Sequence, residues 1–161
     1  MKFESLHDLF VHELEDLYDA EQQITEALPK MQKAASSAEL RAAFGEHLDQ
    51  TKNQIKRLEQ VFQAIGEKPS SHTCKAMKGI IKEGEDMLEA DAEKHVKDAG
   101  LIASAQRVEH YEIAGYGTAR TYAYLLGQEE AARLLQETLD EEELTDKKLT
   151  KIATSINVEA V

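Results

Sequence analysis

The chain has few of the residues that interrupt or cross-link a polypeptide. Its 161 residues include 2 prolines, 8 glycines, 1 cysteine and no tryptophan. Scarce proline and glycine favour long helices over many short strands. The single cysteine, Cys74, excludes an internal disulfide. No segment approaches the run of roughly 18 apolar residues that a membrane-spanning helix needs.

Basic residues are also scarce. Lys and Arg number 19 against 31 Asp and Glu, which gives a formal net charge of −12. This charge argues against nucleic acid or an anionic membrane as the main partner, and it suits a protein that attracts cations. The N-terminal segment has acids and His within its short apolar stretch, unlike a signal peptide, so we expect a cytoplasmic location.

Apolar residues recur in steps of three, four and seven along four segments, as they do in amphipathic helices. These segments cover residues 3–35, 36–65, 94–126 and 128–156. A shorter apolar pattern covers residues 74–88. The sequence therefore predicts four long helices, with one short helix between the second and the third.

Local signals predict where these helices begin and end. The polar residues placed to cap a helix N-terminus are Ser5, Ser36 or Ser37, and Asp91. Asp8 completes a capping box with Ser5, and Glu39 completes one with Ser36. Pro29 is expected to kink or divide the first helix. Gly66 is expected to end the helix at 36–65, and Gly127 the helix at 94–126.

Short turns near Ser36 and Gly127 join the long helices into two antiparallel hairpins. The link between the hairpins is long and contains the short helix. An antiparallel four-helix bundle with one long crossover between its second and third helices is the arrangement of ferritin-like folds. We therefore expect residues 1–161 to form a single all-α, ferritin-like helical domain.

Carboxylates interrupt the apolar stripes near the midpoints of the long helices. The candidate site residues at this level are Glu21, His47, Gln50, Gln54, Glu109, Glu112, Glu142 and Asp146. Midpoints meet at one level in an antiparallel bundle, so these side chains are expected to converge. Burying an unpaired carboxylate costs on the order of several kcal/mol, a cost that bound cations offset. The sequence therefore predicts a buried metal site.

The residue types indicate which metal this site would take. Oxygen ligands with a nearby imidazole suit iron(II) or manganese, whereas scarce cysteine disfavours structural zinc. Carboxylates that project inward from all four helices are the design of di-iron carboxylate proteins. Glu109 and Glu112 are three residues apart on one helical face, which suits two metals about 4 Å apart. We expect a dinuclear centre with iron or manganese.

Simpler interpretations of the same residues stay open. With 31 acids, some fall on a stripe by chance, so Glu112 and Glu142 are alternatively solvated surface acids. His47 is alternatively a core or surface histidine, and Asp146 a partner of nearby lysines. Glu4 and His7 match a Glu-x-x-His spacing but lie at a helix start, far from the common level.

Two tyrosines lie close in sequence to the predicted ligands. Tyr116 is one turn from Glu112, and Tyr18 is beside Glu21.

Motifs for other chemistry are missing: the sequence has no Gly-rich phosphate loop, His-Glu-x-x-His motif or EF-hand pattern. Nucleotide and hydrolase chemistry are therefore poorly supported.

Four runs of sequence resemble the YciF-like bacterial stress-response proteins. They are DLYDAEQQ at 16–23, HLDQTKNQIKRL at 47–58, VEHYEIAGYGT at 108–118 and LLQETLDEEELTDKKL at 134–149. The resemblance covers nearly the whole chain. It implies a ferritin-like fold similar to rubrerythrin, a role in stress, a dinuclear metal motif and a homodimer.

The resemblance also implies which residues belong to the site. The positions that match the family's acids and its second-helix run are Glu21, Glu109, Glu112, Glu142, His47 and Gln54. One departure is Gln50, where relatives often have Glu. The Glu-x-x-His pairs usual in ferritins are also missing from the second and fourth helices. One of two metal positions is therefore expected to bind weakly or stay empty.

These observations leave two main functional hypotheses. The first is a ferritin-like stress protein that oxidises iron(II) with oxygen or peroxide, with Glu112 and Glu142 as metal ligands. The second is a non-enzymatic helical homodimer, a structural or interaction module with a vestigial or partly occupied metal site. An iron-storage cage is a third alternative.

Overall fold

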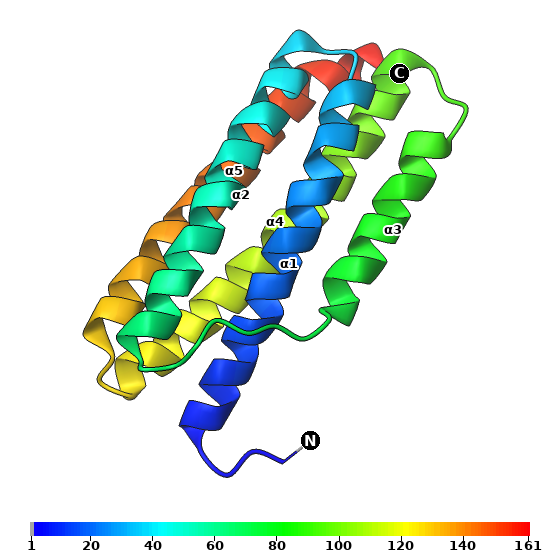
Figure 1. The fold of residues 1–161 in the computed structure, drawn as a ribbon. Coiled ribbons are helices and arrows are strands. Elements are labelled where there is room, and N and C mark those ends of the chain that lie inside the picture. Colours follow the sequence, from blue (N-terminus) through cyan, green and yellow to red (C-terminus); the bar gives the residue numbers. More distant parts are fainter. Residues whose placement is uncertain (1) are drawn as a thin grey trace.

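The computed structural model describes residues 2–161, which contain five α-helices and no β-strand (Figure 1). The helices are α1 (Leu6–Ala34), α2 (Ala38–Ala64), α3 (Lys75–Glu89), α4 (Lys94–Leu125) and α5 (Glu129–Glu159). The predicted all-α class is confirmed. None of the described helices is long and apolar enough to cross a membrane.

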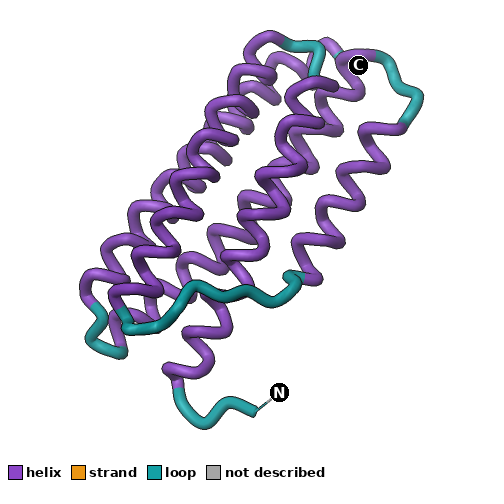
Figure 2. Tube along the Cα trace, in the orientation of Figure 1, coloured by secondary structure: helices purple, strands orange, loops and turns teal. Residues whose placement is uncertain are grey.

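The four long helices pack side by side, and the short helix flanks them. Figure 1 shows α1 and α2 joined by a short turn at one end, and α4 and α5 joined by another turn at the opposite end. α2 also packs against α5, and α1 against α4. α3 contacts α1 and α4 along one side. Residues 65–74 run across α1 to reach α3 (Figure 2).

Capping side chains define most helix starts. The predicted capping box at Ser5 is confirmed: the backbone N–H of Asp8 donates to Ser5 Oγ at 3.1 Å, and the N–H of Ser5 donates to Asp8 Oδ2 at 3.1 Å. Ser37 caps α2, since its hydroxyl accepts from the N–H of Leu40. The predicted capping box between Ser36 and Glu39 is wrong, because α2 begins one residue later than it requires.

Two further expectations about helix limits are corrected. α1 continues through Pro29, because the buried Leu28 and Met31 on either side of it are held in the core. The predicted division of this helix is therefore wrong. Glu93, and not Asp91, is the N-cap of α4: its side chain accepts from the N–H of His95 at 2.8 Å.

Glycines end α2 and α4, as predicted. Gly66 has a φ of 78° and Gly127 a φ of 70°, both in the left-handed region that favours glycine. The same hydrogen bond closes both ends: Glu67 N–H donates to Phe62 O, and Gln128 N–H to Ala123 O, each at 2.9 Å. This is the pattern of a Schellman motif.

The apolar core is divided into two clusters along the length of the molecule. The first cluster includes Ile24, Leu28, Phe44, Leu101, Leu149 and Ile152. The second includes Phe10, Leu14, Phe62, Ala119, Leu135 and Leu139. In each long helix the change from one cluster to the other occurs near the helix midpoint. Buried polar residues occupy this boundary layer.

Candidate metal centre

Four buried side chains meet in the boundary layer. They are His47 of α2, Glu109 and Glu112 of α4, and Glu142 of α5, and none is more than 3% exposed. Each offers one ligand atom, and these atoms all lie within 4.8 Å of one another. Glu109 and Glu112 share one face of α4 because they are three residues apart. These four residues can hold a metal ion.

Several carboxylate oxygens in this layer have no hydrogen-bond donor among the described residues. Both carboxylate oxygens of Glu112 are buried without a hydrogen-bond partner among the described residues, as are one oxygen each of Glu21, Glu109 and Glu142. Buried polar atoms are almost always paired, because leaving one unpaired costs about 1–3 kcal/mol. A cation held by Glu109, Glu112 and Glu142 would pair with buried oxygens that otherwise have no partner, so the donor set fits a bound metal.

Burial and mutual repulsion change the titration of these acids. Burial raises the pKa of Glu112 well above its usual value, and the charges of Glu21 and Glu142 raise it further. Burial raises the pKa of Glu21 and Glu109 in the same direction, with Glu142 as a second cause for both. The metal-free cluster therefore retains protons, which a metal would displace on binding.

Gln50 orients the imidazole of His47. Gln50 Oε1 lies 3.4 Å from His47 Nδ1 and also accepts from the hydroxyl of Thr145. His47 Nε2, the other ring nitrogen, lies 3.3 Å from Glu109 Oε1 and 3.9 Å from Glu142 Oε2. An imidazole nitrogen among carboxylates, with the other ring nitrogen beside an amide oxygen, is the arrangement of a metal-binding histidine.

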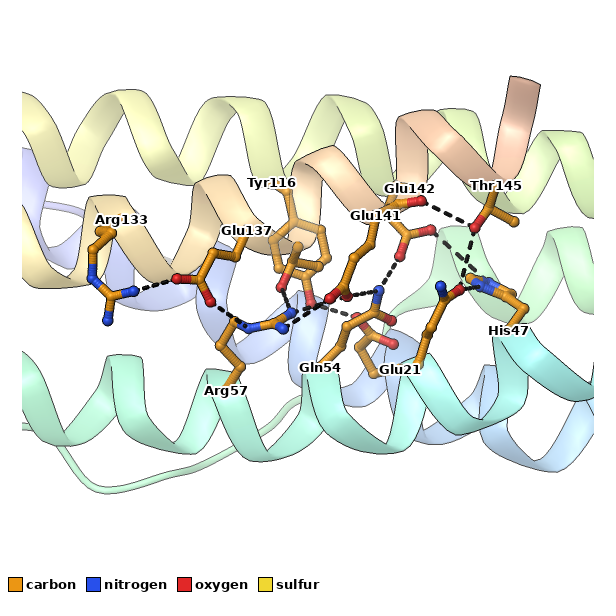
Figure 3. A network of polar contacts seen from close by, with 12 residues as sticks. Glu21, His47, Gln54, Arg57, Tyr116, Arg133, Glu137, Glu141, Glu142 and Thr145 are labelled. Carbon is orange, nitrogen blue, oxygen red and sulfur yellow. Dashed lines mark hydrogen bonds and ion pairs between the residues drawn. The ribbon is translucent and has the colours of Figure 1, made fainter. Parts of the chain in front are cut away.

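A polar network outside the four residues positions Glu142 (Figure 3). Gln54 donates to Glu142 Oε1, and also to Glu141 Oε2 at 3.0 Å. Arg57 in turn holds Glu141 through two hydrogen bonds of 3.0 and 2.9 Å. Such outer partners fix the direction in which a ligand carboxylate points.

Glu21 of α1 adjoins the group and is held by a tyrosine. The buried hydroxyl of Tyr116 donates to Glu21 Oε1, while Glu21 Oε2 has no partner (Figure 3). Burial and the charge of Glu21 raise the pKa of Tyr116 well above its usual value. Glu21 therefore presents one free oxygen in the same layer as Glu112 and Glu142.

The family model described as a domain of unknown function, DUF892, matches residues 5–161. The chain belongs to the DUF892 family. It is 47% identical to Protein YciF of Escherichia coli K12 over 154 residues. This matched region covers 95% of this chain and 93% of that protein. The resemblance to YciF-like proteins is confirmed.

Solved structures agree with this membership of the DUF892 family. The crystal structure of the E. coli stress protein YciF matches with a TM-score of 0.93 and 46% identity, over 96% of this chain and 98% of that chain. YcfI from Rhodopseudomonas palustris matches with a TM-score of 0.89 and 46% identity, over 91% of this chain and 94% of that chain. A protein from Xanthomonas campestris shares the fold at a TM-score of 0.76 and 21% identity, over 96% and 94%.

Asp146, a predicted site residue, and Tyr18, a predicted neighbour of Glu21, bind other partners in this DUF892 chain. Asp146 accepts from Gln106 Nε2 at 3.0 Å and lies 3.3 Å from His110 Nε2, so its partners come from the outer face of α4 and are not lysines. The hydroxyl of Tyr18 donates to Glu59 at 2.9 Å and does not reach Glu21. Adjacent or nearby residues in a helix can face different neighbours.

The sequence interpretation also missed two contributors, Arg57 and Glu141. A weak signal was present, because Arg57 follows Gln54 by three residues and so shares its helical face. Glu141 directly precedes the predicted ligand Glu142, and nothing in the spacing distinguishes it from other acids of this segment. Only the packing of α2 on α5 reveals that it links Arg57 to Gln54.

Proposed function

We propose that this DUF892 chain is a ferritin-like stress protein with a dinuclear carboxylate centre for iron or manganese. Residues 1–161 would form one domain. The observation that carries the proposal is the layer of buried carboxylate oxygens without donors, centred on Glu112. The arrangement of four long helices with α3 in the crossover supports the ferritin-like assignment.

The proposed ligands divide between two positions. His47 and Glu109 would bind at one side of the layer, and Glu21 at the other side. Glu112 and Glu142 would be shared by the two positions. His47 would bind through Nε2, with Gln50 holding its other ring nitrogen. The remaining layer residue, Gln54, would orient Glu142 without binding metal.

The proposed reaction is the oxidation of iron(II) by dioxygen or hydrogen peroxide. With dioxygen, two iron(II) ions lose one electron each, and dioxygen takes up both electrons and two protons to give hydrogen peroxide. With hydrogen peroxide, the same two electrons and two protons give two water molecules. The carboxyl groups of Glu21, Glu109 and Glu112, whose pKa values are raised, would release protons as iron binds.

Metal analysis tests the proposal. We expect protein produced in iron-supplemented medium to contain iron or manganese, and Glu112→Gln to lose most of it. Glu143→Gln, which removes an exposed acid of α5, is the matched control and should keep the metal. The metal-free Glu112→Gln variant should be at least as stable as wild type, because a neutral amide replaces a buried carboxyl group that repels its neighbours when it ionises. Unchanged metal content in a folded Glu112→Gln variant would overturn the assignment.

A second candidate function is a non-enzymatic helical homodimer that acts as a structural or interaction module. The amide side chains of Gln50 and Gln54 in the layer favour it, because Gln54 already occupies one oxygen of Glu142. Iron(II) oxidation with added peroxide distinguishes the two, since an inert protein would match a protein-free blank. A solution mass of twice the chain mass would support a dimer and exclude a storage cage.

A further inference from the structure

A small apolar cavity lies between α1, α3 and α4, beside the candidate metal centre. Its volume is about 30 Å³. α3 lines it with Ile81, Gly84 and Leu88, and aliphatic side chains of α1 and α4 line most of the rest. His47 and Glu109 also line it, from the boundary layer. The cavity therefore extends from α3 to two of the four candidate ligands.

The other side of the cavity faces the seam between α1 and α3. Lys30 and Glu85 line this side and form an ion pair of 2.9 Å, with side chains that are 57% and 44% exposed. A surface hollow of about 120 Å³ shares Ala27, Lys30, Ile81 and Glu85 with the cavity. These shared residues place the surface hollow next to the cavity at this seam, and exposed side chains such as those of Lys30 and Glu85 change rotamer within nanoseconds.

The volume and lining of the cavity select a small apolar occupant. One water molecule needs roughly 10–15 Å³ of such space and about two to four polar partners. Ile24, Leu28 and Val108 in the lining offer none, and the Ser104 hydroxyl already donates to Gly100 O at 3.0 Å. The other polar groups of the lining are the seam pair Lys30 and Glu85 and the candidate ligands His47 and Glu109. A diatomic apolar molecule fits the volume and gives up no hydrogen bonds on entering.

We propose that this cavity binds dioxygen and passes it to the metal centre from the side of His47 and Glu109. The inference rests on the proposed function, and it deepens it by selecting dioxygen over peroxide. Hydrogen peroxide would have to give up its hydrogen bonds to water to enter an aliphatic cavity. α3 would then have a role beyond packing, as the cover of the passage.

Gly84 and Gly79 of α3 provide a matched pair of variants. A Cβ atom at Gly84 would lie 3.7 Å from Ser104 Cβ, an ordinary contact, so Gly84→Leu would extend into the cavity. A Cβ atom at Gly79 meets no atom within 4 Å, so Gly79→Leu makes the same change to the helix in open space. Gly84→Ala is a milder second variant in case the leucine prevents folding.

Xenon binding tests the cavity without any metal, because dry apolar cavities in proteins bind xenon. Crystals of the metal-free protein would be pressurised with xenon and its anomalous signal measured. We expect one xenon site in the cavity in wild type and Gly79→Leu, and loss of that site in Gly84→Leu. Gly84→Ala should show reduced occupancy. Absence of xenon from the wild-type cavity would overturn the proposal.

Stopped-flow oxidation of bound iron(II) tests the passage. We expect the dioxygen-dependent rate of Gly84→Leu to fall several-fold against Gly79→Leu, with equal iron bound and equal rates with peroxide. Equal dioxygen rates in the two variants would overturn the passage, as would equal slowing with both oxidants, which would indicate damage to the centre. A xenon-filled cavity in a protein that binds no iron would refute the proposed function and the passage together.

Discussion

Gln50 shows how much the role of one residue depends on what faces it. In the sequence it is a neutral residue among predicted acidic ligands, which suggests a lost ligand. In the structure its oxygen lies beside His47 Nδ1 and the hydroxyl of Thr145. The geometry therefore favours a positioning role, in which Gln50 holds the ring so that Nε2 faces Glu109.

Replacement of Gln50 by alanine tests this role. We expect Gln50→Ala to weaken iron(II) or manganese binding by about 10- to 100-fold, the range measured when an orienting partner of a ligand is lost. Isothermal titration calorimetry of the metal-free protein would measure it. Gln60→Ala, on the exposed face of α2, is the control. Equal affinities of Gln50→Ala and wild type would contradict the positioning role.

The hydroxyl of Tyr116 donates to the carboxylate of Glu21, so it should matter for stability. We expect Tyr116→Phe to lower the free energy of unfolding of the metal-free protein by about 1–3 kcal/mol, because Glu21 then has no partner for either oxygen. Urea denaturation would measure the change. Tyr124→Phe, with a side chain that is 75% exposed, should have no effect. A similar small change in both variants would refute the expectation.

At the scale of elements, α4 carries two kinds of buried acid. Asp98 is as buried as Glu109 and Glu112, but its two oxygens accept from the backbone N–H groups of Ser36 and Ser37 at 2.8 and 2.7 Å. It fastens the start of α4 to the turn between α1 and α2. Burial alone therefore does not mark a candidate ligand; a buried carboxylate oxygen without a donor does.

Asp98→Ala should destabilise the fold without affecting metal binding. The two N–H groups would lose their acceptor in a partly buried turn, at a cost of about 2–4 kcal/mol. Chemical denaturation would show a lower midpoint, and metal content should stay at the wild-type level. Asp91→Ala, an exposed neighbour, is the control. A loss of metal in a folded Asp98→Ala variant would contradict this division of roles.

At the scale of the whole molecule, the polar layer interrupts an otherwise continuous core. Two apolar clusters lie on either side of it, and every long helix contributes to both. Apolar side chains in the layer would bury more hydrophobic surface and avoid the repulsion between acids. The arrangement thus favours a function of the layer over stability of the metal-free fold.

The stability of the metal-free protein should depend on pH in a direction set by these acids. Glu21, Glu109 and Glu112 have pKa values well above their usual 4.5 in the fold. Above about pH 4.5 the folded chain binds protons that the unfolded chain has released, so the free energy of unfolding falls as pH rises toward neutral. Their stabilising contribution is fully present only below that pH.

Urea denaturation at several pH values, with and without a chelator, would measure this dependence. We expect bound metal to remove the decline, because metal binding displaces the protons and strengthens as pH rises. Glu112→Gln should show a shallower decline than wild type. A metal-free stability that rises from about pH 5 to about pH 7 would contradict the assigned pKa directions.

Local features of the sequence were sufficient to predict the helices themselves. Period and cap chemistry act within a few residues, so the five helices, the box at Ser5 and the ends at Gly66 and Gly127 were predictable. Errors arose where two local signals competed, as between Ser36 and Ser37. The division predicted at Pro29 is wrong, since α1 continues through it with Leu28 and Met31 buried on either side.

The sequence by itself determined an all-α chain with acids at the midpoints of its helices. The periodicity of apolar residues indicates which face of each helix is buried. The similar lengths of the antiparallel helices indicate that their midpoints meet at one level. Only the tertiary structure decided which buried acids keep donors, as Asp98 does, and which lack them, as Glu112 does. That distinction depends on atoms from other helices, whose approach no local pattern encodes. It is also what separates a structural carboxylate from a candidate metal ligand.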